Sequence, residues 1–167
     1  YYNVAQLLKE PVGSTRTHSL KECFVIDENN EVSANGSVVL VKTHNGVWCR
    51  ANLVCNMEAD CSRCLNDVSY SINIDLDEEY FPTVDITSGK TVYNQEYKNS
   101  PFSIDDKHGL DLTEGLRQYV IAYQVMKPLC RLECQGLCSH CGADLNMRLC
   151  SCYNGLHISG SDDNPVS

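Results

Sequence analysis

The stretch VWCRANLVCNMEADCSRCLNDVSYSINIDLD, residues 47–77, alternates between apolar and polar positions on both sides of a Cys-x-x-Cys pair. From 47 to 61 the odd positions hold apolar residues or cysteine, and from 68 to 76 the even positions are apolar. A period of two is typical of a β-strand with one buried face. The pattern predicts two long antiparallel strands joined at residues 61–67, and therefore a β-rich domain.

Shorter signals on the N-terminal side of these strands predict further elements. Residues 1–11 are typical of a short amphipathic helix. Within the polar stretch 12–35, residues 24–26 are the one segment that predicts a strand. An apolar run at 38–41 leads into Asn45-Gly46, and this dipeptide is a strong hairpin signal.

Beyond these strands the sequence predicts a loop, a helix and a cysteine-rich segment. Residues 82–110 are polar and carry proline and glycine, which predicts a long loop with one short strand. Apolar residues recur at helical spacing over 111–126, and Asp111 is suited to cap the start of that helix. Residues 130–152 hold six cysteines and too few apolar residues for a core of their own.

Length, charge and composition exclude several classes of protein. The 167 residues suffice for one domain with a small appendage, and 43% hydrophobic with 21% charged residues is typical of a folded chain. The net charge of −9 argues against tight binding of naked nucleic acid. The sequence contains neither a transmembrane run nor a secretory signal. We therefore expect a cytoplasmic protein, unless a transit peptide has been removed.

The chain has eleven cysteines, an odd number that, without an export signal, favours metal thiolates over disulfides. Eight of them fall in four pairs, and two pairs supply the four ligands of one tetrahedral zinc site. The preferred arrangement has a first site at Cys61, Cys64, Cys130 and Cys134, and a second at Cys138, Cys141, Cys150 and Cys152. The alternative is a single site drawn from residues 130–152, with Cys61 and Cys64 unmetallated.

Other uses of the cysteines are weighed against zinc. Redox catalysis by Cys-x-x-Cys usually places the first cysteine at a helix N-terminus, whereas Cys61 ends a predicted strand. Structural disulfides and an iron–sulfur cluster are further alternatives that the spacing favours less than zinc. Cys49 and Cys55 lie on the inward face of the predicted strand, where cysteine behaves as a small apolar residue.

Few other residues carry a functional signal. The sequence contains no phosphate-binding loop, nucleophile elbow or metalloprotease motif, which predicts a scaffold rather than an enzyme. Charged and apolar side chains near the cysteines are candidates for contact with a protein partner or RNA: Arg63, Leu65, Arg131, His140 and Arg148. His140 is also an alternative zinc ligand.

Together these features predict an α+β fold, mainly an antiparallel β sheet or partial barrel with a packed helix and a small zinc-stapled C-terminal lobe. The predicted domains are 1–129 for the β-rich part, 130–152 for the cysteine-rich lobe and 153–167 for a disordered tail. The lobe is expected to depend on its metal, because a structural zinc site contributes on the order of 10 kcal/mol at neutral pH.

Several of these segments resemble the YceD family, the large ribosomal RNA subunit accumulation proteins of bacteria and chloroplasts. The similarity rests on Cys61-Ser62-Arg63-Cys64-Leu65, on Asp111-Leu112 at the start of the predicted helix, and on Pro128-Leu129-Cys130. It continues over residues 134–142 and 145–146 and closes with Cys150-Ser151-Cys152. Residues 4–14 are also similar to some bacterial members.

The resemblance implies a role in making or preserving large-subunit rRNA, and so in ribosome biogenesis, without implying a reaction. We therefore expect a non-enzymatic zinc-binding factor that binds a ribosome-assembly protein or rRNA. The resemblance places it in the bacterial cytoplasm, or in the chloroplast stroma if a transit peptide has been removed. The alternatives are a direct RNA-binding module and a Cys-x-x-Cys thiol oxidoreductase. Some members of the family lack the C-terminal cysteine module, so the resemblance implies that the second zinc site belongs to a subset.

Overall fold

The computed structural model describes residues 1–27, 30–92, 100–147 and 150–152 of the chain. The chain divides into two compact units. The first, here called the β unit, comprises Tyr1–Glu58 and Ser69–Val125. The second, the cysteine unit, comprises Ala59–Val68 and the described part of Met126–Ser167.

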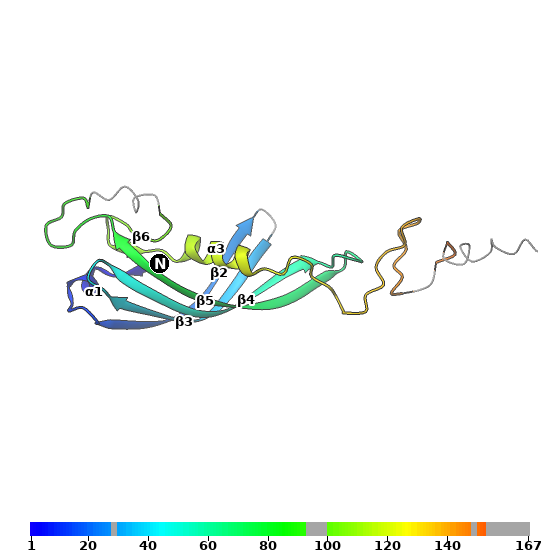
Figure 1. Cartoon of the computed structure of the whole chain (residues 1–167), viewed down its shortest axis with the longest axis horizontal. Helices are drawn as coiled ribbons and strands as arrows, with labels where there is room; N and C mark the ends of the chain where they lie inside the picture. The colour runs from blue at the N-terminus through cyan, green and yellow to red at the C-terminus, as the bar shows by residue number, and fades with distance from the viewer. Residues whose placement is uncertain (28–29, 93–99, 148–149, 153–167) are drawn as a thin grey trace, which may run out of the picture. The chain divides into compact units, whose positions relative to one another are not determined.

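One sheet dominates the β unit (Figure 1). The strands are β1 (Tyr2–Asn3), β2 (Thr15–Asp27), β3 (Asn30–Lys42), β4 (Val47–Asp60), β5 (Asp67–Pro82), β6 (Ser103–Ile104) and β7 (Gly109–Leu110). The helices are α1 (Ala5–Lys9) and α3 (Thr113–Tyr123). The sheet order is β1-β7-β6-β5-β4-β3-β2. Strand β5 pairs with β6 in parallel, whereas β3 pairs with β2 and β4 in antiparallel fashion.

Strand β4 has the burial pattern that its sequence predicts. From Val47 to Met57 the odd-numbered residues are buried and the even-numbered ones are exposed. Cys49 and Cys55 have no exposed surface and belong to the hydrophobic core. Burial raises the pKa of the Cys49 thiol to about 12, so this residue stays neutral and apolar. The interpretation of both cysteines as core residues is confirmed.

The sheet curls into a half-barrel, and the predicted α+β fold class is confirmed. Tyr2 on β1 and His18 on β2, at opposite edges of the sheet, come into ring contact with their centroids 4.8 Å apart. Helix α3 lies over the curved sheet in Figure 1. Its Leu116 and Val120 are buried in the same hydrophobic core as the inward-facing side chains of the strands.

The N-terminal hairpin is longer than the sequence predicts. Strand β2 covers Thr15–Asp27 rather than residues 24–26 alone, and it pairs with β3 along its length. Residues 15–23 are mostly threonine, serine and charged side chains, so they lack the apolar alternation that identifies a strand. Their strand conformation depends on hydrogen bonds to a partner strand, which composition does not reveal.

Helix α3 is shorter than the predicted 111–126. The backbone N–H of Thr113, its first residue, donates a hydrogen bond of 2.9 Å to the Asp111 carboxylate. The helix ends at Tyr123, because Gln124 adopts an extended ψ of 146°. None of the described helices is long and apolar enough to cross a lipid bilayer.

The segment 82–110 contributes two short strands, β6 and β7, where one was predicted. Residues 93–99 of this segment, and the predicted disordered tail 153–167, lie outside the described residues. The two strands extend the sheet beyond β5 and connect it to β1. This long connection therefore completes one edge of the half-barrel.

Asn45 and Gly46 lie in the connection between β3 and β4, as predicted. The glycine is needed there for a reason other than the positive φ that Asn-Gly hairpin turns usually require. The Oγ1 of Thr43 accepts a hydrogen bond of 2.8 Å from the backbone N–H of Gly46. Neither Asn45 nor Gly46 has a positive φ. A Cβ at residue 46 would lie 2.1 Å from the carbonyl oxygen of Tyr80. Glycine is therefore required by this close approach of two backbones.

Candidate metal centres

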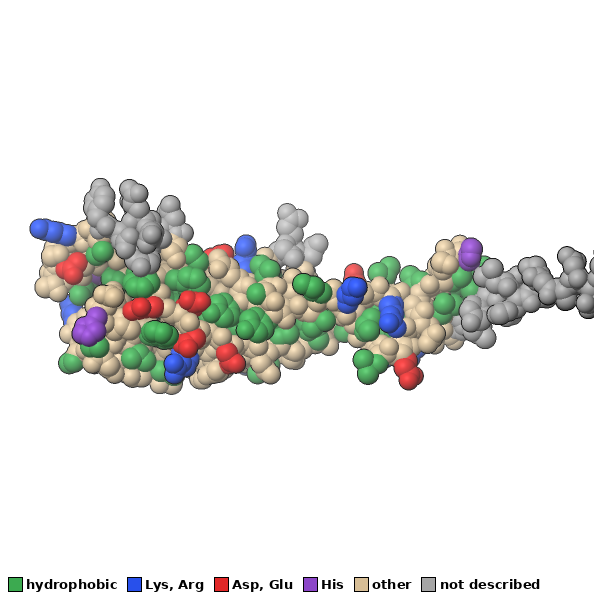
Figure 2. All heavy atoms as spheres, in the orientation of Figure 1, with side chains coloured by type: hydrophobic (Ala, Val, Ile, Leu, Met, Phe, Trp, Pro, Cys, Tyr) green, Lys and Arg blue, Asp and Glu red, His purple; other side chains and the backbone are tan. Residues whose placement is uncertain are grey.

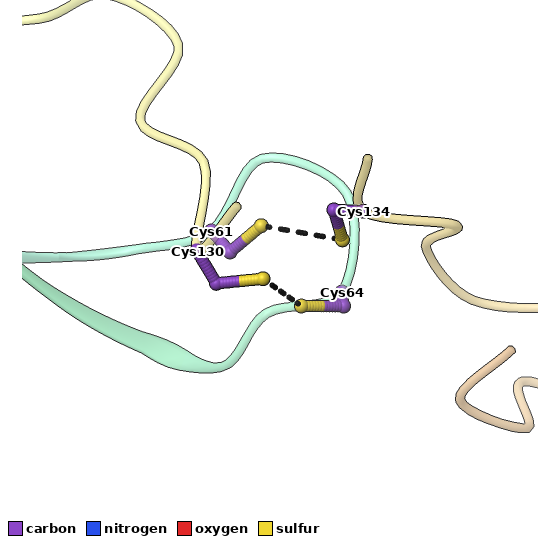
Figure 3. Close-up of side chains that lie close together, drawn as sticks. All are labelled: Cys61, Cys64, Cys130 and Cys134. Atoms are coloured by element: carbon purple, nitrogen blue, oxygen red, sulfur yellow. Dashed lines mark hydrogen bonds between the residues drawn. The ribbon is translucent and has the colours of Figure 1, made fainter. Parts of the chain in front are cut away.

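Two clusters of four cysteine sulfurs lie within the cysteine unit. In the first tetrad, Cys61 and Cys64 come from the turn between β4 and β5, and Cys130 and Cys134 from the chain after α3 (Figure 3). Their Sγ atoms all lie within 4.8 Å of one another. The second tetrad, which meets the same criterion, consists of Cys138, Cys141, Cys150 and Cys152. Either tetrad could hold a metal ion.

The sulfur separations in the first tetrad fit a tetrahedral metal centre. The Sγ atoms of Cys61 and Cys134 are 3.8 Å apart, and those of Cys64 and Cys130 are 3.6 Å apart. An ion bonded to four sulfurs at about 2.3 Å separates them by about 3.8 Å, the edge of the tetrahedron. A disulfide needs about 2.0 Å, and none of the eleven cysteines, all of which lie in the described part of the chain, is in a disulfide. The tetrad therefore has the size that a metal–thiolate site requires.

A tight turn aims backbone N–H groups at the first sulfur of this tetrad. The N–H of Cys61 donates to the carbonyl of Asn66 at 2.8 Å, and the N–H of Leu65 donates to the carbonyl of Cys61 at 2.9 Å. Hydrogen bonds from backbone N–H groups, that of Arg63 first among them, lower the pKa of the Cys61 thiol to about 6. The turn thus favours the thiolate form, which is the form that binds metals.

The second Cys-x-x-Cys pair repeats this turn. The N–H of Cys138 donates to the carbonyl of Ala143, and the N–H of Gly142 donates to the carbonyl of Cys138, both at 2.8 Å. Backbone N–H groups of Cys141 and His140 lower the pKa of the Cys138 thiol to about 6. Two segments with unrelated flanking sequences therefore build the same thiolate-stabilising turn.

In each tetrad the pKa of another thiol is raised instead of lowered. The backbone N–H of Asn66 favours ionisation of Cys64, but burial and the nearby Cys61 sulfur raise the Cys64 pKa to about 12. Contact with Cys141, together with burial, raises the pKa of Cys152 to about 11. Closely spaced thiols cannot all ionise without a compensating positive charge. A metal ion supplies that charge, so its binding to either tetrad must release protons.

Asn146 supports the first tetrad although it lies between cysteines of the second in the sequence. Its Nδ2 donates to the Sγ of Cys134 at 3.4 Å and to the carboxylate of Asp144 at 2.7 Å. Its Oδ1 accepts hydrogen bonds of 2.8 Å from the backbone N–H of Gln135 and from Nη2 of Arg131. Cysteine spacing does not identify Asn146. The sequence feature that points to it is that it lies in one of the segments that resemble the YceD family.

Replacing Asn146 with alanine is expected to weaken metal binding at the first tetrad by about tenfold or more, because groups that orient a ligand typically contribute that much. Competition with a chromogenic chelator measures the affinity of each site. Gln135→Ala is the matched control, since within the described part of the chain the Gln135 side chain donates to the carbonyl of Glu133 and not to a tetrad sulfur. Equal losses in the two variants would contradict the role given to Asn146.

The predicted contact residues divide into two groups. Nη1 of Arg63 donates to the backbone carbonyl of Cys134 at 2.9 Å, and Arg131 donates to Asn146 as described. Both arginines therefore hold the cysteine unit together. Of the other candidates, Leu65 and His140 are exposed, and Arg148 lies outside the described residues.

The cysteine unit differs in extent from the predicted lobe 130–152, because it includes the hairpin tip, Ala59–Val68. The backbone N–H of Ser62 donates to the carbonyl of Pro128 at 2.8 Å. Cys61, Cys64 and Cys134 form a small buried cluster of their own, against which Val68, Leu129 and Leu137 pack. The tip and the C-terminal segment thus share one cluster of buried sulfurs.

Comparison with known proteins assigns this chain to a family. The family model described as "Large ribosomal RNA subunit accumulation protein YceD" matches residues 49–159, a segment that contains all eight cysteines of the two tetrads. Comparisons with curated proteins and with solved structures yield no match. Because the matched segment covers more than half of the 167 residues, the chain belongs to the YceD family of large ribosomal RNA subunit accumulation proteins.

Proposed function

We propose that this chain is a zinc-binding factor without catalytic activity that supports large-subunit rRNA accumulation, and so ribosome biogenesis, by binding a protein or RNA partner. One observation carries the proposal: two cysteine tetrads lie inside the segment that the YceD family matches. Family membership supports the role in rRNA accumulation, and the tetrads support metal binding. The ligands in the proposal are the eight cysteines of the two tetrads.

Zinc is the metal that these donors favour. Four cysteine thiolates in a tetrahedral arrangement suit Zn²⁺, and a site closed by four protein ligands leaves no position for a substrate. Zinc would therefore serve the structure of the cysteine unit. The first ion would hold the hairpin tip to the chain around Cys130, and the second would close the segment from Cys138 to Cys152.

A thiol oxidoreductase is the second candidate, because the pKa of Cys61 is lowered to about 6. A redox thiolate must also be accessible to its substrate. Cys61 has no exposed surface, and its sulfur lies among the three other sulfurs of the first tetrad. Burial and crowding therefore favour a metal ligand over a redox nucleophile at this position.

Elemental analysis of the full chain, purified without chelator, is expected to find two zinc ions per molecule. Cys61→Ser and Cys150→Ser should each remove one ion, because each takes one thiolate from a different tetrad and a serine hydroxyl is a poor zinc ligand. Cys23→Ser is the matched control, since Cys23 is exposed and belongs to neither tetrad. That variant should keep both ions.

The same variants test whether the metal sites are needed for large-subunit rRNA accumulation. In cells of the source organism that lack the chain, the ratio of large-subunit to small-subunit rRNA is expected to fall. The wild-type chain and Cys23→Ser should restore the ratio, whereas the double variant Cys61→Ser/Cys150→Ser should not. A metal-free chain with fewer free thiols than cysteines would contradict the zinc sites, and an unchanged rRNA ratio would contradict the biological role.

A further inference from the structure

The residue after each Cys-x-x-Cys pair has the same backbone conformation but a different side chain. In the second turn it is Gly142, with a φ of 71°, and in the first it is Leu65, with a φ of 61°. Glycine adopts this left-handed region freely, whereas a residue with a Cβ is disfavoured there. Leucine thus stands at a position where glycine fits the same turn better.

The Leu65 side chain gains little within its own unit that would offset this strain. It is 64% exposed, while Val68, Leu129 and Leu137 are the apolar side chains that pack against the buried cysteines. Leu132, on the other chain segment of the first tetrad, is 89% exposed. Both segments that carry this tetrad therefore present a leucine to solvent.

An exposed apolar side chain on a rigid support is typical of a protein-docking anchor, because little conformational freedom is lost on binding. Figure 2 shows hydrophobic side chains on the visible surface of the cysteine unit. We propose that Leu65 is the anchor through which this unit docks into an apolar pocket on a protein of the assembling large ribosomal subunit. The inference rests on the proposed function, in which metal holds the hairpin tip rigid.

The charges of the cysteine unit favour a protein partner over RNA. Its described residues carry three arginine or lysine and four aspartate or glutamate side chains. Arg63 and Arg131 already donate hydrogen bonds inside the unit. A zinc ion with four thiolates adds a net charge of about −2 at each site. RNA phosphates need a basic surface, whereas a pocket edged with lysine or arginine complements this acidic unit.

Two defined probes test the proposal with the metal-loaded, fluorescently labelled full chain. One is the protein fraction of purified large ribosomal subunits freed of RNA, and the other is large-subunit rRNA freed of protein. We expect saturable binding to the protein fraction, weakened about tenfold or more by Leu65→Gly. Leu65→Met keeps an apolar side chain at the tip and should bind nearly as well as wild type.

Metal content and an unrelated surface variant serve as controls. Leu65→Gly should hold its zinc at least as tightly as wild type, because glycine relieves the left-handed strain. Val54→Ser removes an exposed apolar side chain from the β unit and should leave binding unchanged. Equal binding by Leu65→Gly and wild type overturns the proposal, and so does a lack of binding to the protein fraction. Binding to rRNA that falls steeply with salt and ignores Leu65→Gly identifies an RNA partner instead.

Rescue experiments in cells distinguish failure of the docking inference from failure of the proposed function. Normal large-subunit rRNA in cells without the chain would overturn the proposed function. Loss of that rRNA, followed by full rescue with Leu65→Gly, would overturn the docking inference alone. The expected result is rescue by Leu65→Met and little rescue by Leu65→Gly.

Discussion

Removing the metal from the purified chain is expected to unfold the cysteine unit and to leave the β unit folded. Among the described residues of the cysteine unit, the apolar cluster has three buried members, Cys61, Cys64 and Cys134, with three partly buried neighbours. In the proposed function metal–thiolate bonds supply its stability, because structural zinc typically contributes about 10–16 kcal/mol at neutral pH. The core of the β unit draws on α1, α3 and the long strands and includes no cysteine of either tetrad.

Amide hydrogen exchange with and without chelator measures this difference. The N–H of Cys61, bonded to the carbonyl of Asn66, and that of Leu137, bonded to the carbonyl of Arg63, should lose their protection when the metal is removed. The amides of β3 and β4 between Val38 and Leu53 should keep theirs. Returned zinc should restore the protection, because the thiols remain free.

The double variant Cys61→Ser/Cys150→Ser provides the control without chelator. It should exchange like the chelated wild type, and added zinc should not rescue it. Joint loss of protection in the sheet and in the cysteine unit would contradict independent stability of the β unit. Full retention of protection in both would mean that the cysteine unit folds through its few apolar contacts, against the expected dependence on metal.

Short-range sequence patterns, the apolar alternation and the cysteine spacing, predicted the parts of the fold that depend on them. The alternation from Val47 to Met57 predicted β4 and its buried face, because one face of that strand packs on the core along its length. The preferred grouping of the eight cysteines matches the two sets that the structure brings together, although spacing alone left a single site within residues 130–152 open. The first prediction depends on short sequence distances, and the second on the arrangement of eight of the eleven cysteines in four pairs.

Features that depend on distant neighbours were not predictable in the same way. The polar first half of β2 is a strand because β3 lies beside it. Asn146 contacts the Cys134 sulfur only after the chain has folded back on itself. The hairpin tip belongs to the cysteine unit because its sulfurs join those of Cys130 and Cys134, which lie far along the chain.

Gly36→Ala is expected to lower the free energy of unfolding of the β unit by about 3 kcal/mol, at the upper end of typical overpacking losses. Gly36 lies inside β3, paired with Leu20 on β2 and with Leu53 on β4. A Cβ at this position would lie 2.0 Å from the carbonyl oxygen of Asn52 and 2.9 Å from the Cα of Leu53. Both are backbone atoms, so no side-chain rotation relieves the contact, and β3 and β4 must move apart.

Urea denaturation of the metal-loaded chain, followed by the fluorescence of its single tryptophan, Trp48 on β4, measures the loss. Asn35→Ala, on the neighbouring position and the opposite face of β3, should change stability by no more than about 0.5 kcal/mol. Without a clash, Gly36→Ala would stabilise the protein by about 0.4–1 kcal/mol, because alanine reduces the entropy of the unfolded chain. The two explanations therefore predict opposite signs. A stabilised variant would show that β3 and β4 separate easily at this point. A destabilised variant would show that glycine is required here by the close approach of the two strands.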